Sequence, residues 1–390
     1  MVLRECIFVR KEQFAMLPIF LPHLHDTASS YNGTAPTLLR KELPMKTNLS
    51  INYESYVRQL VKLAAFILLA TPAFAQTYTI TDLGTLGGNG NYSVAYCING
   101  SGQVSGASSA PSNQMSDPAF LYSNGQMINI GTLGGESALG RGINTSGQIA
   151  GYSTLATGAY HAFLYTGGQM MDIGTLGADY AVAYALNDAG QVVGNSAHLG
   201  GQDHAFLYSN GQMTDLGTLG GDTSNAYGIN NLGVIAGYSY NASGNFLGFI
   251  YQNGTMTPIG TLGGSWSIAY AINDQNQIAG QAYTRGNRAA HAFRLSDGQM
   301  VDLGSLGGSS SWGLAINNSG TVVGFATTRR NEYHAFVSTN GARMQDLNKL
   351  IPRYTGWILG QANGINDAGQ IAGFGTIRGQ THAFLLTPVQ

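Results

Sequence analysis

The sequence predicts an all-β protein, a seven-bladed β-propeller of four-stranded antiparallel blades that its own N-terminal strand closes. Three observations predict this fold. A pattern with a spacing of 43 residues recurs along the chain. Each copy consists of short apolar runs separated by Asn, Asp and Gly, which is typical of strands joined by hairpins. The chain also begins with a strand that has no earlier partner and ends one strand short.

The clearest marker of the repeat is the tripeptide His-Ala-Phe, which occurs five times and is replaced by Pro-Ala-Phe and Leu-Gly-Phe in two further copies. The middle residues of these tripeptides are Ala119, Ala162, Ala205, Gly248, Ala292, Ala335 and Ala383. The spacing is 43 or 44 residues except for a final step of 48. A near-constant period of this length indicates stacked supersecondary units, and four short strands fit into one unit as in a propeller blade.

One unit illustrates the four predicted strands. The first ends in the pair Ile272-Asn273, the second covers residues 277–280, the third covers 291–295 and the fourth covers 300–304. These runs of five to eight residues are too short for helices. The Asn-Asp-x-Gly segments at 187–190 and 366–369 are predicted to be hairpin turns rather than calcium loops, because they lack a further Asp-x-Asp or a distal Glu. The Leu-Gly-Gly that follows most of the fourth strands is predicted to be a tight turn between units.

The two ends of the chain favour a closed ring. Residues 78–84 match the fourth strand of a unit but precede every first strand, and the last unit stops after residues 384–386 without a fourth strand. If these segments pair, both sheet edges disappear, whereas an open stack needs capping repeats. The alternative architecture is an open β-solenoid.

The first 75 residues are predicted to lie outside this fold. From Met45 a basic stretch, a short apolar run at 63–70 and a small-residue site ending at Ala75 form the pattern of a secretory signal peptide. We expect cleavage after Ala75, a mature domain at 76–390 and a secreted, extracellular or periplasmic protein. Residues 1–44 are expected to be a gene-start artefact or a disordered extension. The alternative for 63–70 is a buried helix or a membrane anchor; the mature chain is predicted to have no transmembrane segment.

Composition excludes several classes of partner. The formal net charge is −2, which argues against a general electrostatic grip on nucleic acid. The two cysteines, Cys6 and Cys97, cannot form a disulfide framework or a structural zinc site. We therefore predict no cofactor and no metal.

Residues that recur in every unit are predicted to be scaffold, because a catalytic site needs a few groups that converge on one point. The repeated histidines are expected to form structural hydrogen bonds to the aspartates of the fourth strands. These residues are His161, His204, His291, His334 and His382, with Asp82, Asp172, Asp215, Asp302 and Asp346. His198 and Asp203 stand outside the repeat and are expected to face solvent.

A second column of residues lies two positions before the conserved aliphatic of each first strand. Its members are Tyr96, Arg141, Tyr184, Tyr227, Tyr270, Leu314 and Asn363. Such tyrosines near the axis could line a site for a sugar or a peptide, or could pack blade against blade. Arg141 is the only charged residue of the column and is a candidate binding residue.

Loops between the second and third strands differ from unit to unit and share one face with the connections between units. Variable loops on a repeated scaffold are where recognition usually resides. Residues 76–284 hold one basic and ten acidic side chains, whereas 285–390 hold nine basic and five acidic ones. The candidate binding residues in the later loops are Arg285, Arg288, Arg329, Arg330 and Arg378, whose guanidinium groups suit carboxylate or phosphate, or are simply solvated surface charges. Trp266 is a candidate aromatic platform on the same face.

The His-Ala-Phe tripeptides, the Asp-Leu-Gly-Thr-Leu-Gly-Gly segments and the Ile-Asn-Asp-Ala-Gly-Gln-Ile-Ala-Gly segments resemble those of the bacterial extracellular repeat proteins known as the HAF family. The resemblance covers about residues 77–386. It implies a secreted or surface-exposed protein and carries no reaction with it.

Three functions follow as hypotheses. The first is a non-catalytic secreted binding or scaffolding propeller whose ligand is an anionic polysaccharide or a protein partner on the variable-loop face. The second is an extracellular hydrolase or lyase acting on a glycan or lactone at the propeller axis, which needs two carboxylates close together there. The third is a structural surface or matrix protein without a ligand.

Overall fold

The computed structural model describes residues 76–87, 92–111 and 117–389. These residues form strands β1 to β28 and two short 3-10 helices, η1 (Arg285–Asn287) and η2 (Leu347–Lys349). The described part of the chain is therefore all-β, as the sequence predicts. The expected signal peptide at 45–75 and the expected extension at 1–44 lie outside the described residues.

The strands follow one another in units of four. Unit 1 consists of β2 (Ser93–Ile98), β3 (Val104–Ser108), β4 (Ala119–Ser123) and β5 (Gln126–Gly131). Unit 2 consists of β6 (Gly134–Ile143), β7 (Ile149–Leu155), β8 (Tyr160–Thr166) and β9 (Gln169–Asp172). Unit 3 consists of β10 (Gly177–Leu186), β11 (Val192–His198), β12 (Asp203–Ser209) and β13 (Gln212–Asp215). Unit 4 consists of β14 (Gly220–Ile229), β15 (Ile235–Asn241), β16 (Phe246–Gln252) and β17 (Thr255–Pro258).

The remaining strands continue this order to the end of the chain. Unit 5 consists of β18 (Gly263–Ile272), β19 (Ile278–Thr284), β20 (Ala290–Ser296) and β21 (Gln299–Asp302). Unit 6 consists of β22 (Gly307–Ile316), β23 (Val322–Thr328), β24 (Tyr333–Ser338) and β25 (Gln345–Asp346). Unit 7 consists of β26 (Trp357–Ile365), β27 (Ile371–Ile377) and β28 (Gln380–Pro388), and its fourth strand is β1 (Tyr78–Asp82).

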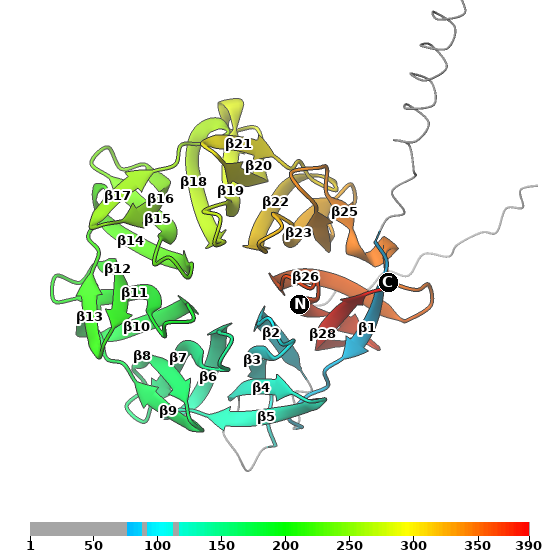
Figure 1. Cartoon of the computed structure of the whole chain (residues 1–390), viewed down its shortest axis with the longest axis horizontal. Coiled ribbons are helices and arrows are strands. Elements are labelled where there is room, and N and C mark those ends of the chain that lie inside the picture. The colour runs from blue at the N-terminus through cyan, green and yellow to red at the C-terminus, as the bar shows by residue number, and fades with distance from the viewer. Residues whose placement is uncertain (1–75, 88–91, 112–116, 390) are drawn as a thin grey trace, which may run out of the picture. The chain divides into compact units, whose positions relative to one another are not determined.

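Within a unit, consecutive strands pair antiparallel in chain order. Single parallel contacts, Tyr160 with Tyr180 and Ala290 with Ser310, join units 2 and 3 and units 5 and 6 into eight-stranded sheets. β1 pairs antiparallel with β28, with Tyr78 opposite Pro388 and Asp82 opposite Phe384. The pairing of the first and last described strands is the one that the sequence predicts. Figure 1 shows the sheets arranged around a common centre, with β1 in blue beside β28 in red.

The apolar core lies between neighbouring sheets. The phenylalanine of each tripeptide is fully buried, with 0% exposure, at Phe120, Phe163, Phe206, Phe249, Phe293, Phe336 and Phe384. Each buried cluster combines residues of adjacent units, as where Phe206 of unit 3 packs with Ala150 and Ala162 of unit 2. One cluster joins Phe120 of unit 1 to Ala372 and Ala383 of unit 7. A unit therefore cannot bury its apolar face alone, which is the physical reason for repetition.

The glycine in each Gln-Ile-Ala-Gly segment is needed for this packing. At Gly280, a Cβ atom would overlap the carbonyl oxygen of Ile268 on β18 and the ring of Phe293 on β20. Only a residue without a side chain lets the first strand and the phenylalanine approach so closely. The second strand of each unit is therefore fixed by the sequence pattern as well as by its apolar residues.

The first strands are longer than the sequence predicts. Five of them, β6, β10, β14, β18 and β22, have ten residues. Four of these begin at the Gly-Gly pair that we expected to form only a turn, and β10 begins at Gly177, which is followed by Ala178. Gly263 has a φ of 93°, and the next residue, Gly264, has no room for a Cβ beside Tyr283. The Gly-Gly pair thus makes a kink that is already paired with the end of the second strand, so that the turn and the strand overlap.

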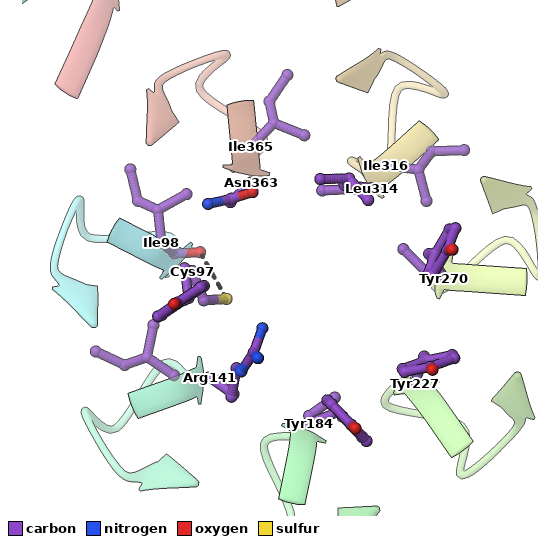
Figure 2. Close-up of a pocket in the computed structure, with 18 of the residues that line it drawn as sticks. Cys97, Ile98, Arg141, Tyr184, Tyr227, Tyr270, Leu314, Ile316, Asn363 and Ile365 are labelled. Atoms are coloured by element: carbon purple, nitrogen blue, oxygen red, sulfur yellow. Dashed lines mark hydrogen bonds between the residues drawn. The ribbon is translucent and has the colours of Figure 1, made fainter. Parts of the chain in front are cut away.

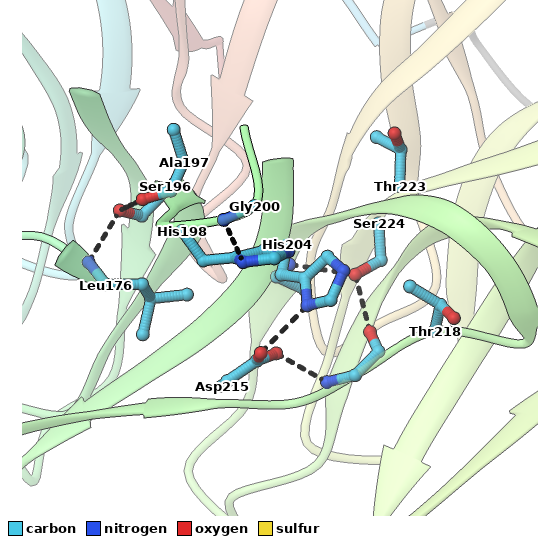
Figure 3. Close-up of polar contacts among 12 residues, drawn as sticks. Leu176, Ser196, Ala197, His198, Gly200, His204, Asp215, Thr218, Thr223 and Ser224 are labelled. Carbon is cyan, nitrogen blue, oxygen red and sulfur yellow. Dashed lines mark hydrogen bonds and ion pairs between the residues drawn. The ribbon is translucent and has the colours of Figure 1, made fainter. Parts of the chain in front are cut away.

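The five predicted contacts between repeated histidines and aspartates are all present. Nδ1 of each histidine lies 2.8–2.9 Å from the aspartate of a fourth strand, including His382 with Asp82 across the β28–β1 pair. In unit 3, Asp215 also accepts a hydrogen bond from the backbone N–H of Gly217 at 2.7 Å (Figure 3). The pair therefore fixes the connection that leads to the next unit. These imidazoles serve the scaffold.

His198 and Asp203 do not face solvent freely, contrary to our expectation. The ring of His198 packs on that of His204, with centroids 4.5 Å apart, and its Nδ1 accepts the N–H of Gly200 (Figure 3). Asp203 accepts a hydrogen bond from Nδ2 of Asn195 at 3.1 Å. Both side chains are half-buried.

Candidate functional site

A cavity of about 360 Å³ lies where the first strands of all seven units meet. This volume falls within the range of small-molecule pockets, about 300–1,000 Å³. Each first strand contributes the residues around its conserved aliphatic side chain. The innermost strands β2, β6, β10, β14, β18, β22 and β26 therefore form one continuous wall.

The column of residues that the sequence singled out faces this cavity. Figure 2 shows Arg141, Tyr184, Tyr227 and Tyr270 on neighbouring strands around the opening, with Leu314 and Asn363 completing the circuit. Tyr96 also lines the cavity. The tyrosines also contact one another between units, with ring centroids 4.7 Å apart for Tyr184 and Tyr227 and 5.3 Å apart for Tyr227 and Tyr270.

Among the described residues that line the cavity, Arg141 is the only charged one. Its guanidinium carbon lies 4.4 Å from the centroid of the Tyr96 ring, 5.7 Å from that of Tyr184 and 5.8 Å from that of Tyr152. A cation near aromatic faces is held by the ring quadrupoles. The tyrosines thus position the guanidinium without neutralising its charge.

The Nε atom of Arg141 is buried and has no hydrogen-bond partner in the described structure. No Asp or Glu is among the described residues that line the cavity. Burying a charged donor without a partner is unfavourable, because the hydrogen bonds to water are lost and not replaced. The site therefore contains an unused donor beside an unneutralised positive charge, which is the arrangement that an anionic ligand satisfies.

The tyrosines of the wall stay protonated well above neutral pH. Burial raises the pKa of Tyr270 to about 12. Burial is also the main cause of the raised pKa values of Tyr96, Tyr184 and Tyr227, and Arg141 lowers those three values only partly. The hydroxyl groups are therefore neutral and able to donate hydrogen bonds to a ligand.

Two lining residues were missed by the sequence analysis. Cys97 lies beside the conserved aliphatic Ile98, and burial raises the pKa of its thiol, which makes it a poor nucleophile. Gln361 reaches the cavity from β26 and donates a hydrogen bond to Asn363 at 2.7 Å. A bulge between Ala95 and Cys97 changes which residues of β2 face inward. Simple alternation along a strand does not reveal such a change.

A ring of asparagines lies next to the aliphatic residues, at the end of the first strands. The Nδ2 atom of each asparagine donates to the backbone oxygen of the equivalent asparagine in the next unit, over 2.9–3.1 Å. The members are Asn99, Asn144, Asn187, Asn230, Asn273, Asn317 and Asn366. The last of these bonds runs from Asn366 of unit 7 to the backbone oxygen of Asn99 of unit 1. The sevenfold aliphatic-Asn pattern was visible in the sequence, but its role was not predicted.

The predicted loop arginines occupy separate places. Arg285 belongs to η1 and Arg288 follows it, whereas Arg378 lies in the turn between β27 and β28. Arg329 and Arg330 line a groove of about 630 Å³ together with Glu332, His334, Asp346 and Lys349. All five arginines are exposed, and within the described residues none of them forms a salt bridge. All five lie in the connections between the second and third strands of units 5, 6 and 7, and Arg329 and Arg330 line the same groove.

Trp266 lies at the start of β18 and is half-buried. Its ring stacks on Phe246, with centroids 5.1 Å apart, and contacts Tyr283 at 4.6 Å. It is therefore part of a cluster of aromatic rings.

No group of three or more His, Cys, Asp or Glu side chains that could hold a metal ion occurs among residues 76–87, 92–111 and 117–389. In the same residues, no helix is long and apolar enough to cross a bilayer.

The sheets arranged around a central cavity define the class of fold, the β-propeller. The structure is similar to the propeller domain of the trilobed protease from Pyrococcus furiosus, described as having an open velcro topology, with a TM-score of 0.54 and 7% identity over 80% of this chain and 98% of that one. It is also similar to TolB from Acinetobacter baumannii, with a TM-score of 0.43 and 14% identity over 76% of this chain and 70% of that one. A third similar structure is YCF48 bound to D1 peptide, with a TM-score of 0.46 and 9% identity over 80% of this chain and 96% of that one.

No family model and no curated protein matches the sequence. At 7% identity, the likeness to the trilobed protease domain shows the fold alone.

Proposed function

We propose that the chain forms a closed seven-bladed propeller that binds an anionic extracellular ligand without catalysis. Closure is supported by the pairing of β1 with β28 and by the hydrogen bond from Asn366 to Asn99. It is also supported by the buried cluster that joins Phe120 to Ala372 and Ala383. Each of these contacts links the last unit to the first.

The observation that carries the binding function is the position of Arg141. Its guanidinium group enters a cavity walled by neutral tyrosine hydroxyls, and its buried Nε has no partner. A carboxylate accepts two parallel hydrogen bonds from a guanidinium and would also neutralise its charge. We therefore propose that the cavity takes a carboxylate group of the ligand.

The absence of catalysis is a proposal that rests on how the reactive groups are used. Five histidines are bonded to aspartates of the scaffold. The cavity thiol, Cys97, has a raised pKa because it is buried. The hydrolase or lyase alternative needs a pair of carboxylates near the axis, and none of the residues that line the cavity is acidic.

The loop arginines have a secondary role in this proposal. Arg285, Arg288, Arg329, Arg330 and Arg378 are exposed and lack ionic partners among the described residues. Unpaired surface charges of one sign raise the local concentration of an oppositely charged ligand and accelerate its association. We assign to these arginines the attraction of the ligand and to Arg141 the contact that holds it.

We also propose that the protein is secreted and belongs with the HAF repeat proteins. The signal-like segment at 45–75 and the seven His-Ala-Phe-type copies support this placement. N-terminal sequencing of the protein recovered outside the expressing cell should begin at Gln76. A mature N-terminus elsewhere, or retention in the cytoplasm, contradicts it.

Binding should be measured by screening the protein on an array of acidic and neutral glycans, followed by calorimetric titration of the best acidic ligand. Arg141→Gln should weaken binding by about tenfold to a hundredfold, because a charge-assisted pair is lost. Arg353→Gln, which removes an exposed arginine outside the cavity lining, is the matched control and should change affinity less than about twofold. Equal affinity in wild type and Arg141→Gln overturns the site. Conversion of the bound ligand into a product overturns the non-catalytic part.

A further inference from the structure

A continuous series of aromatic rings leads away from the axial cavity. Its first member, Tyr184, is also a neighbour of Arg141. Successive ring centroids are 4.7 Å apart for Tyr184 and Tyr227, 5.9 Å for Tyr227 and Tyr238, 5.6 Å for Tyr238 and Phe246, 5.1 Å for Phe246 and Trp266, and 4.6 Å for Trp266 and Tyr283. We call Tyr227, Tyr238, Phe246, Trp266 and Tyr283 the aromatic track.

The scaffold does not require these rings. The position of Trp266 at the start of a first strand is Thr223 in unit 4 and Ser310 in unit 6. The position of Phe246 at the start of a third strand is Asp203 in unit 3 and Ala290 in unit 5. The positions of Tyr238 and Phe246 carry aromatic rings in two other units as well, Tyr152 with Tyr160 in unit 2 and Phe325 with Tyr333 in unit 6. What distinguishes the track is Trp266 of unit 5, which stacks on Phe246 of unit 4 and so extends the series from one unit into the next.

The track also lies outside the buried core. None of its five rings belongs to the buried clusters between the sheets, and all five are half-buried. Aromatic side chains that are not enclosed expose part of their faces to whatever occupies the variable-loop side.

The outer end of the track reaches positive charge. Tyr283 is followed by Thr284 and then by η1, where Arg285 and the neighbouring Arg288 are exposed. The loop is held against β18, because Oδ1 of Asn287 accepts the N–H of Ser265 at 2.9 Å. Guanidinium groups therefore stand at both ends of the track, Arg141 inside and Arg285 with Arg288 outside.

We propose that the aromatic track binds several consecutive residues of an acidic polysaccharide, with one carboxylate at Arg141 and others toward Arg285 and Arg288. This proposal rests on the proposed function. The C–H faces of sugar rings carry partial positive charge and pack on the negative faces of aromatic rings. A uronic acid polymer carries both such C–H faces and carboxylates along its length. A series of aromatic rings between two cationic positions offers a partner to each of these groups.

The test is a calorimetric titration of the whole protein with homo-oligouronates that increase in length from the monomer to the hexamer. Affinity for wild type should rise with length and then level off. Trp266→Ala should weaken binding of the longest oligomer by about tenfold and flatten the length dependence. Binding of the monomer should still depend on Arg141.

Trp312→Ala is the matched control. Trp312 also stacks on a phenylalanine, Phe325, with centroids 4.4 Å apart, but it is not part of the track. This variant should bind the hexamer within about twofold of wild type. Trp266→Phe keeps an aromatic face and should restore most of the affinity, which separates a stacking role from a loss of folding.

The outcomes separate the two proposals. Affinity that depends on Arg141 but not on oligomer length overturns the track and leaves the proposed function standing. Equal losses in Trp266→Ala and Trp312→Ala also overturn the track. If an acidic peptide of matched charge binds as tightly as the hexamer, the ligand class is wrong. If Arg141→Gln changes nothing with any oligouronate, the proposed function itself fails.

Discussion

The asparagines at one end of the central cavity are the same in all seven units, whereas the side chains that face into the cavity change from unit to unit. Each asparagine of the ring bonds to the next unit and has only 4–6% exposure. The cavity column instead contains tyrosine, arginine, leucine and asparagine. Both sets of residues lie on the same strands, a few positions apart. The fold alone therefore does not explain why one position is identical in all units and the other varies.

The comparison separates residues that build the protein from residues that are free to serve a ligand. A contact that must be made seven times requires the same side chain seven times, because each interface between units has the same geometry. Arg141 has no equivalent in any other unit and leaves its own Nε unsatisfied. Variation within a repeated position therefore marks the candidate site more clearly than any motif.

The largest effect is expected from removal of β1. Deleting residues 76–84 takes away the partner of β28 together with the buried side chains of Tyr78 and Leu83, which are 4% and 5% exposed. Burial of large side chains contributes about 1.5–3 kcal/mol each, and the hydrogen bonds of the strand are lost as well. We expect a sharp drop in the melting temperature or a failure to fold. An unchanged melting temperature contradicts closure by β1.

A smaller loss of stability is expected when a single asparagine of the ring is replaced by alanine. Asn366→Ala removes the hydrogen bond to the Asn99 oxygen and the one that its Oδ1 accepts from the N–H of Gln370. We expect a loss of about 1–3 kcal/mol in the free energy of unfolding, measured by urea denaturation, with ligand affinity unchanged. Arg141→Gln should instead lower ligand affinity and leave the free energy of unfolding within about 0.5 kcal/mol of wild type. If both variants lower stability equally, the distinction between the two regions is wrong.

Some parts of the fold and of the candidate site could be predicted from the sequence, and others could not. The repeat, the pairing of β1 with β28 and the histidine–aspartate contacts follow from local patterns and from counting strands. The column containing Arg141 could also be found, because its spacing from the aliphatic residue is constant. The proximity of Tyr238, Phe246 and Trp266 could not, since they come from three strands of two units and meet only through the angle between sheets.

The smallest predicted effect is a change in how the stability of the protein depends on pH at acidic pH, through Asp302. Burial pushes the pKa of Asp302 upward, but hydrogen bonds from His291 and from the N–H of Gly304 leave it below its ordinary value. The folded state then binds the proton less readily than the unfolded state. The contribution of this contact is therefore present above the ordinary pKa of aspartate, about 3.9, and is lost as the pH falls through the depressed folded value.

Asp302→Asn should flatten the acid side of the stability profile slightly, because the side chain is partly exposed and the effect is screened. The exposed Asp222→Asn is the control and should leave the profile unchanged. Thermal melts at a series of acidic pH values measure both. An identical acid profile in wild type and Asp302→Asn contradicts the assignment.

The partnership of Tyr78 with Pro388 has a consequence for biosynthesis. β1 finds its neighbour β28 only after residues 380–388 have been translated, so the nascent polypeptide carries an unpaired strand edge until then. Contacts between such distant positions form slowly, and exposed edges attract other chains in the meantime. Prematurely terminated products should therefore aggregate rather than accumulate as smaller folded species.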